Sequence, residues 1–525
     1  MKKLLINASL LVLLVAGFSS CKQRIEDDYQ NPEQTTVANP GKLFNGLFLN
    51  ERIHPSYWDY YTYLFAFTAP YSGLQTILPS STMYLANTSY SDNRWRDYYN
   101  GANGNDYNYN GPGILNNYRE MQTAFNTMSD AEQRKNLIYL KLSEVILCDQ
   151  TSQMVDAFGD IPFSKANSLN LADRSIVFAS YDDAAQIYDT LIYKLDQINN
   201  YLDTATVVST ESANLKIYDR MYAGDLTMWR RYTNSLRLRL LMRISNVSEA
   251  KAKPEIVNML NNSSKYPVIT SNDQDALVWE SPTNLKSDLY DVFKDFRWAP
   301  KYLIDFMTTN NDPRVEVFFD ADGTNGYKGF PYDGTEKDYT NGGYASYDSA
   351  TFFYNYNLPG VLFTAAEVSF IKAEANERWG LGAAETPYAE GIAQSVKFFY
   401  NLNSRIYARS GAPRKWAALI EPSATAVSAY ASSANIALSG STQERLAKIY
   451  TQKWESFFVL QTVQAWSEYR RTGYPEIPVY TSTGTQTKPG VRFLYPSNES
   501  LYNTANYNAV RAKDTRDTKI FWDLN

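Results

Sequence analysis

The feature that most constrains the fold of this chain is a series of long amphipathic segments with helix start signals. The residues Ser129-Asp130-Ala131-Glu132 form a capping box, which opens a helix expected to reach Val155. Apolar residues recur every three or four positions between Tyr181 and Leu202, and Asp225 has the position of an N-cap for another helix. Further helices are expected at residues 41–68, 365–379, 388–400 and 443–471. The chain is therefore predicted to be mainly α.

The expected helices follow one another without a fixed repeat length. A tetratricopeptide array would repeat about every 34 residues, and no such period is present, although the small residues between 365 and 375 suit close helix packing. Residues 70–112 and 270–359 are rich in Gly, Asn, Asp, Tyr and Pro, which is typical of loops. A loop region as long as the second is usually functional. We predict a single domain over residues 41–525 with a loop-rich insert at about 270–359.

The N-terminus has the pattern of a secretory signal. Two lysines precede an apolar run from Leu4 to Phe18, and two serines lead to Cys21. At about 15 residues the run is too short to span a membrane, which takes about 20. The arrangement resembles the bacterial lipobox, which implies that Cys21 is lipidated and begins the mature protein. We expect a signal peptide at 1–20 and a flexible tether at 21–40.

An acidic cluster, Glu26-Asp27-Asp28, follows Cys21 closely. It resembles the surface-export signal of Bacteroidetes lipoproteins, which implies display on the outside of the cell. A solvated tether would have the same composition, and both interpretations can hold together.

Composition excludes several function classes. The net charge of -6, the isoelectric point near 5.2 and the lack of a basic block argue against a nucleic-acid partner. The single histidine, His54, excludes a site with two histidine ligands, and no G-x-S-x-G motif accompanies it. We expect His54 to be structural or exposed and Cys148 to be buried. Asp320-Ala321-Asp322-Gly323 lacks the spaced acids of a calcium loop, so neither a metal nor a cofactor is predicted.

Aromatic residues are unusually abundant. The chain has 42 Tyr and 10 Trp, and aromatic faces stack on sugar rings while the Tyr hydroxyl offers a hydrogen bond. Most of these rings are expected to fill contacts between helices, so the count alone does not establish a sugar site.

Several motifs, taken in order, resemble those of the SusD/RagB family of nutrient-binding outer-membrane lipoproteins. The resemblance spans nearly all of the mature chain. It rests on the segments 156–164 (DAFGDIPFS), 229–240 (WRRYTNSLRLRL), 363–368 (FTAAEV), 373–375 (AEA), 452–454 (QKW), 465–475 (AWSEYRRTGYP) and 492–496 (RFLYP), and on Glu499, Asn506-Tyr507 and Phe521-Trp522-Asp523.

These motifs are interpreted as scaffold. Gly159 lets the chain turn out of a helix, and Trp229 and Leu236 are expected in the core. The arginines of the motifs are expected to pair with carboxylates; the arginines are Arg237, Arg239, Arg470 and Arg471, and the carboxylates are Glu367, Glu374 and Asp160. No catalytic residue is assigned.

The resemblance implies a frame of tetratricopeptide-like helix pairs, with long loops that carry the ligand site. It also implies a partner, a TonB-dependent (SusC-like) transporter barrel in the outer membrane, on which the lipoprotein acts as a lid. The lid would capture a glycan or a peptide outside the cell, and the chain itself would not be an enzyme.

Ligand contacts are expected from aromatic and polar residues in the turn-rich segments. The candidates are Trp58, Tyr84, Asn105, Asp106, Tyr107 and Tyr109 in the first half, and Trp298, Tyr327 and Tyr332 in the second.

Three alternatives remain open at this stage. The ligand could be an oligopeptide rather than an oligosaccharide. The chain could be a surface polysaccharide hydrolase, with Glu367 and Glu374 as a pair of acids facing across a cleft. It could also be a protein-binding scaffold without a small ligand, which would lack a concave aromatic site.

Overall fold

A computed structural model gives the structure of the chain. It describes residues 38–76, 80–85, 87–101, 112–168, 178–279, 289–293, 295–331, 342–405 and 418–525. The expected signal peptide and Cys21 lie outside the described residues. Contacts between Cα atoms divide the chain into residues 1–39 and Pro40–Asn525. The account below concerns the second unit.

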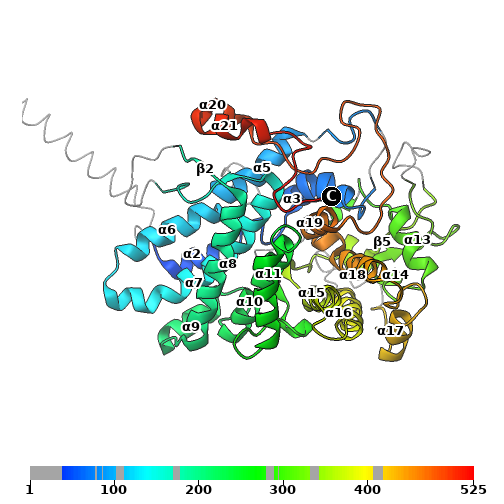
Figure 1. Cartoon of the computed structure of the whole chain (residues 1–525), viewed down its shortest axis with the longest axis horizontal. Helices are drawn as coiled ribbons and strands as arrows, with labels where there is room; N and C mark the ends of the chain where they lie inside the picture. Colours follow the sequence, from blue (N-terminus) through cyan, green and yellow to red (C-terminus); the bar gives the residue numbers. More distant parts are fainter. Residues whose placement is uncertain are drawn as a thin grey trace, which may run out of the picture. The chain divides into compact units, whose positions relative to one another are not determined.

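The second unit is built mainly from helices, which confirms the predicted fold class (Figure 1). The α-helices are α2 (Pro40–Leu47), α3 (Tyr57–Asp59), α4 (Ala69–Tyr71), α5 (Thr88–Tyr99), α6 (Ile114–Asn126), α7 (Asp130–Phe158), α8 (Ala184–Thr204), α9 (Ser209–Tyr218), α10 (Leu226–Ile244), α11 (Glu249–Asn261), α12 (Leu289–Phe293), α13 (Lys301–Thr309), α14 (Val315–Phe318), α15 (Ala365–Trp379), α16 (Glu385–Ser404), α17 (Ala424–Ala431), α18 (Thr442–Phe457), α19 (Thr462–Thr472), α20 (Ser497–Tyr502) and α21 (Thr504–Val510).

Shorter elements connect these helices, and the following are those within the residue ranges that the structure describes. Two π-helices are η1 (Tyr60–Thr68) and η3 (Ser349–Phe353), and three 3-10 turns are η2 (Asn272–Gln274), η4 (Phe458–Leu460) and η5 (Arg511–Lys513). Three antiparallel strand pairs join β1 (Ile161–Pro162) to β2 (Tyr181–Asp182), β3 (Ala276–Val278) to β6 (Gly360–Phe363), and β4 (Phe319–Asp320) to β5 (Ser346–Tyr347).

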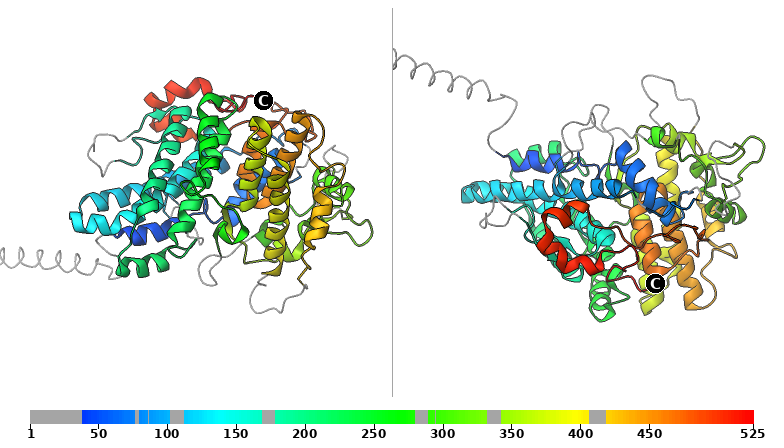
Figure 2. Two further views of the ribbon diagram at one scale, coloured as in Figure 1. Left: turned by 60° about the horizontal axis from the view of Figure 1, so that its bottom comes forward. Right: turned by 90° about the horizontal axis from the view of Figure 1, so that it is seen from above.

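Successive long helices pack side by side. Helices α6, α7, α8, α10 and α11 contact their neighbours in that series, and α15 contacts both α16 and α18. The left-hand view of Figure 2 shows α15, α16 and α18 as parallel rods. The core between them contains large rings, since Trp229, Trp454 and Trp466 are at most 2% exposed. Burying a side chain of this size contributes roughly 2–3 kcal/mol of stability.

The helix start signals act as predicted. The backbone N–H and hydroxyl of Ser129 donate to the Glu132 carboxylate at the start of α7. The Asp225 carboxylate accepts from the N–H groups of Thr227 and Met228 at the start of α10. Asp183 caps α8 in the same way.

Two predicted helices are wrong in part. The helix expected over 41–68 stops at Leu47, and the chain turns before it re-enters helix at Tyr57. The helix expected over 443–471 is interrupted by η4, where Phe458 has a φ of 40°. The Phe458 ring stacks on Phe318 with their centroids 3.8 Å apart. A long-range packing contact therefore accompanies the break, and helical periodicity does not reveal it.

The segment 70–112, expected as loops, contains α5. Its sequence is polar and lacks an apolar stripe, yet Trp95, Tyr98 and Tyr99 are buried along it. The region 270–359 likewise holds short helices and strands between its turns.

His54 and Cys148 are both buried, at 5% and 0% exposure. The burial of His54 agrees with its interpretation as a structural residue. Burial is the main reason that the pKa of His54 falls to about 4 and that the pKa of the Cys148 thiol lies well above its usual range.

Candidate functional site

An aromatic platform lies where α3 leads into η1. We define it by the side chains of Tyr57, Trp58, Tyr61, Tyr90 and Phe296. Trp58 is 40% exposed, and the other four rings are half-buried. An exposed Trp surrounded by partly exposed aromatic rings is characteristic of a binding surface.

The platform rings hold one another by ring contacts. Tyr57 stacks on Tyr61 with centroids 5.5 Å apart, and Trp58 meets Tyr57 edge-on at 5.6 Å. Tyr61 then contacts Tyr90 at 6.4 Å and Phe296 at 5.9 Å. The platform thus joins three segments that are distant in the sequence, and each aromatic contact adds roughly 0.5–1.5 kcal/mol.

Local backbone structure sets the direction of Trp58. The Ser56 hydroxyl accepts the N–H of Trp58 and caps α3, and the Thr62 hydroxyl donates to the Trp58 carbonyl at 2.6 Å. The following helix, η1, has π geometry, which is rare and occurs often at functional sites. Its side chains from Tyr63 to Phe65 are buried, so the platform stands on a fixed base.

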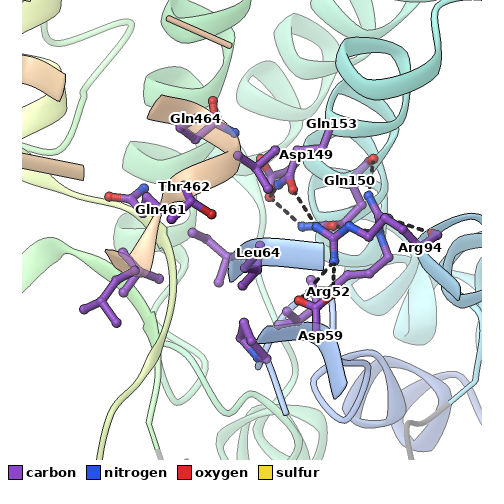
Figure 3. Close-up of a pocket in the computed structure, with 16 residues that line it drawn as sticks. Arg52, Asp59, Leu64, Arg94, Asp149, Gln150, Gln153, Gln461, Thr462 and Gln464 are labelled. Atoms are coloured by element: carbon purple, nitrogen blue, oxygen red, sulfur yellow. Dashed lines mark hydrogen bonds and ion pairs between the residues drawn. The ribbon is translucent and has the colours of Figure 1, made fainter. Parts of the chain in front are cut away.

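Buried charges lie behind the platform. Arg94 donates to both oxygens of Asp59, at 3.1 and 3.4 Å, and its guanidinium lies 4.8 Å from the centre of the Tyr63 ring. Arg52 donates to the side chain and the carbonyl of Gln150. Figure 3 shows Arg52 and Arg94 between Asp59 and the α7 residue Gln150.

Burial shifts the pKa values of this charged layer. It raises the pKa of Glu51 to about 8 and that of Asp97 to about 6, and it lowers the pKa of Arg52 to about 9. The Ser56 hydroxyl, which also caps α3, donates to the Glu51 carboxyl.

Arg52, Asp59 and Arg94 line a small cavity (Figure 3). Its volume open to the centre of a water molecule is about 40 Å³, which has room for a few waters. Small-molecule sites have about 300–1,000 Å³. The cavity is therefore too small for a sugar.

The predicted ligand residues fall into three groups. Trp58 is part of the platform. Tyr84 and Trp298 are buried, at 4% and 7% exposure, and Tyr327 is half-buried. The Tyr84 hydroxyl donates to the carbonyl of Tyr480, and Trp298 packs with Phe330 and Tyr344. Outside the described residues lie Asn105, Asp106, Tyr107, Tyr109 and Tyr332.

The motif carboxylates are engaged by arginines. Arg239 donates to both oxygens of Glu367, at 2.6 and 2.5 Å, and Arg471 donates to both oxygens of Glu374, at 2.8 and 2.7 Å. Both carboxylates are 0% exposed. They therefore face arginines and not a cleft, which removes the geometric basis for reading them as a glycosidase pair.

The remaining motif residues, Asp160, Arg237 and Arg470, have partners other than those predicted. Asp160 binds Lys513 at 2.6 Å, and Arg237 binds Asp196 and Glu255. Arg470 donates to the carbonyls of Asp156 and Val491.

Neither a metal cluster nor a membrane-spanning helix is found in the part of the chain that the structure describes. Groups of three or more His, Cys, Asp or Glu side chains with metal-binding geometry are absent there. No helix within those same ranges is both long enough and apolar enough to cross a bilayer. The Asp322 carboxylate instead accepts the N–H groups of Thr324 and Asn325 in a turn.

Comparisons with known proteins agree with the fold. Residues 71–496 match the SusD-like family model described as "starch-binding associating with outer membrane". No curated protein sequence matches the chain significantly.

Solved structures with similar folds cover nearly the whole chain. A chitin-binding protein has a TM-score of 0.71 at 22% identity, over 93% of this chain and 100% of that one. A SusD homologue from Bacteroides fragilis has a TM-score of 0.69 at 20% identity, over 92% and 100% of the two chains. A chitin-binding SusD homologue from Flavobacterium johnsoniae has a TM-score of 0.69 at 22% identity, over 93% and 99%. Because the family model spans most of its length, the chain belongs to the SusD-like family, as its ordered motifs predicted.

Proposed function

We propose that this protein captures a glycan on the aromatic platform and delivers it to a TonB-dependent transporter, over which it acts as a lid. A lipid on Cys21 would hold it on the outer membrane, facing the exterior of the cell. The chain itself would catalyse no reaction.

The platform is the observation that carries this proposal. A half-exposed Trp beside stacked Tyr rings offers flat apolar faces to a sugar ring, and the Tyr hydroxyls offer hydrogen bonds to its hydroxyl groups. Membership of the family supports the ligand class, since its description names starch and the outer membrane. Two of the similar structures are named as chitin-binding.

Titration of the mature protein with maltoheptaose and with chitohexaose tests the ligand class by calorimetry. Trp58→Ala should weaken binding by about tenfold, because one lost aromatic contact of about 1.4 kcal/mol corresponds to that factor. Tyr193→Ala is the matched control, since Tyr193 is 64% exposed on α8 away from the platform. Equal affinity of the Trp58 variant and the wild type would contradict the role of the platform.

Extraction of the native lipoprotein in mild detergent tests the partner and the alternative ligand. Mass spectrometry of the denatured complex should identify a barrel-sized membrane protein together with oligosaccharide. Peptides in place of oligosaccharide would change the ligand and keep the lid mechanism. Absence of both the barrel and a ligand would contradict the transport role and favour a protein-binding scaffold.

A further inference from the structure

A second concave region lies on the other side of α5 from the platform. It is a cleft of about 600 Å³, within the range of small-molecule sites. Residues of α5 and of α20 line it, together with Phe178 and Ala179. Figure 1 shows α20 and α21 close to β2 and α5. We call it the α5–α20 cleft.

The cleft and the platform use different faces of α5. Tyr90 faces the platform and Arg94 faces the charges behind it. Asp92 and Arg96, each two residues further along, line the cleft. In an α-helix with 3.6 residues per turn, residues two apart lie on nearly opposite sides. The two surfaces are therefore distinct.

The walls of the cleft are fixed by hydrogen bonds. The Asn503 amide donates to the Ala179 carbonyl at 3.0 Å, and the Tyr181 hydroxyl donates to Glu499 at 2.8 Å. On the α5 side, the Asn167 amide donates to the Tyr99 carbonyl at 3.1 Å. The first two bonds attach the α20 region to the segment of β2, and the third attaches the segment after β1 to the end of α5.

Two polar atoms of the α5 wall lack partners among the described residues. Asp92 Oδ1 and Arg96 Nε are buried, and neither has a hydrogen-bond partner in that part of the chain. Both residues line the cleft. Buried polar groups normally have partners, and leaving one without a partner costs about 1–3 kcal/mol. Because protein atoms cover both groups, a hydroxyl of a ligand reaches them only after a rotation of the Asp92 and Arg96 side chains toward the cleft, and it would then satisfy them, since a hydroxyl donates and accepts.

The remaining lining has the character of a sugar site. Five asparagines contribute amides, which both donate and accept; they are Asn93, Asn100, Asn167, Asn498 and Asn503. Two exposed rings stand at the cleft, Tyr502 at 68% and Phe178 at 55% exposure. The ionic groups are of both signs, with Asp92 and Glu499 opposite in charge to Arg96, so the cleft favours an uncharged ligand over an anionic one.

We propose that the α5–α20 cleft is a second binding site for an uncharged oligosaccharide, separate from the aromatic platform. This inference rests on the proposed glycan-binding function and adds a second place of contact on the same molecule. Two sites on one rigid frame could engage a single long chain, and the gain in affinity would come from effective concentration.

Calorimetry with four forms of the protein tests the second site, with maltoheptaose and chitohexaose as probes. The forms are the wild type, Trp58→Ala, Tyr502→Ala, and the double variant. We expect a stoichiometry of two for the wild type with one of the probes. Trp58→Ala should weaken one of the two binding events about tenfold, Tyr502→Ala should weaken the other by a similar factor, and the double variant should weaken both. Leu501→Ala is the matched control, because Leu501 is 67% exposed on the same helix and does not line the cleft.

Hydrogen exchange of the Trp58→Ala variant gives a second readout at the cleft. The probe should slow exchange in residues 89–96 and 497–503 of this variant as much as in the wild type, although its binding to the platform is weakened. A stoichiometry of one, with binding weakened by Trp58→Ala but not by Tyr502→Ala and with no protection at the cleft, would overturn the second site and leave the proposed function intact. Wild-type protein that binds neither probe would overturn the glycan function and the second site together.

Discussion

Glu51 connects the platform to the buried charges behind it. Its carboxyl accepts the hydroxyl of Ser56, and Ser56 in turn caps the short helix that carries Trp58. Burial is the main reason that its pKa rises to about 8, and the charges of Asp59 and Asp97 act in the same direction. At neutral pH Glu51 is therefore mostly protonated in the folded state.

This shift predicts a loss of stability as the pH rises. Between pH 4.5 and 8 the folded chain keeps a proton on Glu51 that the unfolded chain releases. The free energy of unfolding therefore falls across that window, by up to about 5 kcal/mol from this group. Glu51→Gln mimics the protonated form, so its unfolding free energy in urea should fall less between pH 5 and pH 8.5 than that of the wild type.

Glu385→Gln is the control for this experiment. Glu385 is exposed and binds Arg445, and its substitution should leave the fall of the wild type nearly unchanged. Part of the fall should persist in every variant, because burial also raises the pKa of Asp275 to about 8. A Glu51 variant with the same pH dependence as the wild type would show that the carboxyl is ionised in the folded state.

The residues of the aromatic platform show how much of the candidate site the sequence could predict. Trp58 could be proposed because it is a Trp next to a turn-rich segment. Its partners Tyr61, Tyr90 and Phe296 could not, because the last lies more than 200 positions away and only tertiary packing brings it to Tyr61. Tyr84 and Trp298 have the same local appearance as Trp58, yet packing buries them.

At the scale of elements, the sequence predicts the bounds of a helix correctly where its capping residues and its apolar periodicity agree. The predicted bounds of α15 coincide with the observed ones, because Thr364 caps its start and Gly380 takes a left-handed conformation at its end. Helix α5 could not be predicted in this way. Its buried side carries Arg94 and Asp97 as well as rings, and a search for apolar periodicity does not detect a face of that kind.

The break between α18 and α19 allows a prediction about backbone strain. Phe458 has a φ of 40°, a conformation that costs a residue with a Cβ atom roughly 1–2 kcal/mol. Phe458→Ala and Phe458→Gly both lose the buried ring, but only the glycine variant relieves the strain. We expect both variants to be less stable than the wild type and the glycine variant to be about 1 kcal/mol more stable than the alanine variant.

The same pair of substitutions at a regular helical position provides the control. At Ala373, within α15, the native alanine should be more stable than Ala373→Gly by about 1 kcal/mol. Thermal unfolding of the four proteins measures both differences. If alanine is also preferred at residue 458, the backbone there does not carry the strain that its φ indicates.

At the scale of the whole molecule, the scaffold was more predictable than the binding surface. The motif arginines at 239 and 471 pair with Glu367 and Glu374 as expected. The ordered motifs predicted the family that the match over residues 71–496 shows. The α5–α20 cleft was not predicted, because α5 and α20 are about 400 positions apart and neither has a binding motif of its own.

The attachment of the whole molecule to a membrane depends in our proposal on one sulfur atom. Cys21→Ser should move the protein from the membrane fraction to the soluble fraction, because it removes the site of acylation and the acyl chains provide the anchor. Immunoblots of fractionated cells measure the distribution. Cys148→Ala is the control and should stay with the membrane, since Cys148 is buried in α7. Retention of the Cys21 variant in the membrane fraction would refute the lipid anchor.

The burial of Cys148 also makes the protein convenient for spectroscopy. Its thiol has no exposed surface, and its raised pKa keeps it protonated and unreactive toward maleimides. In the mature chain, with Cys21 acylated or replaced, a cysteine introduced at the exposed Leu501, beside the cleft but outside its lining, would be the one thiol open to a dye. A single fluorophore could then report the arrival of a sugar at the cleft, or the closing of the lid, with the native core left unaltered.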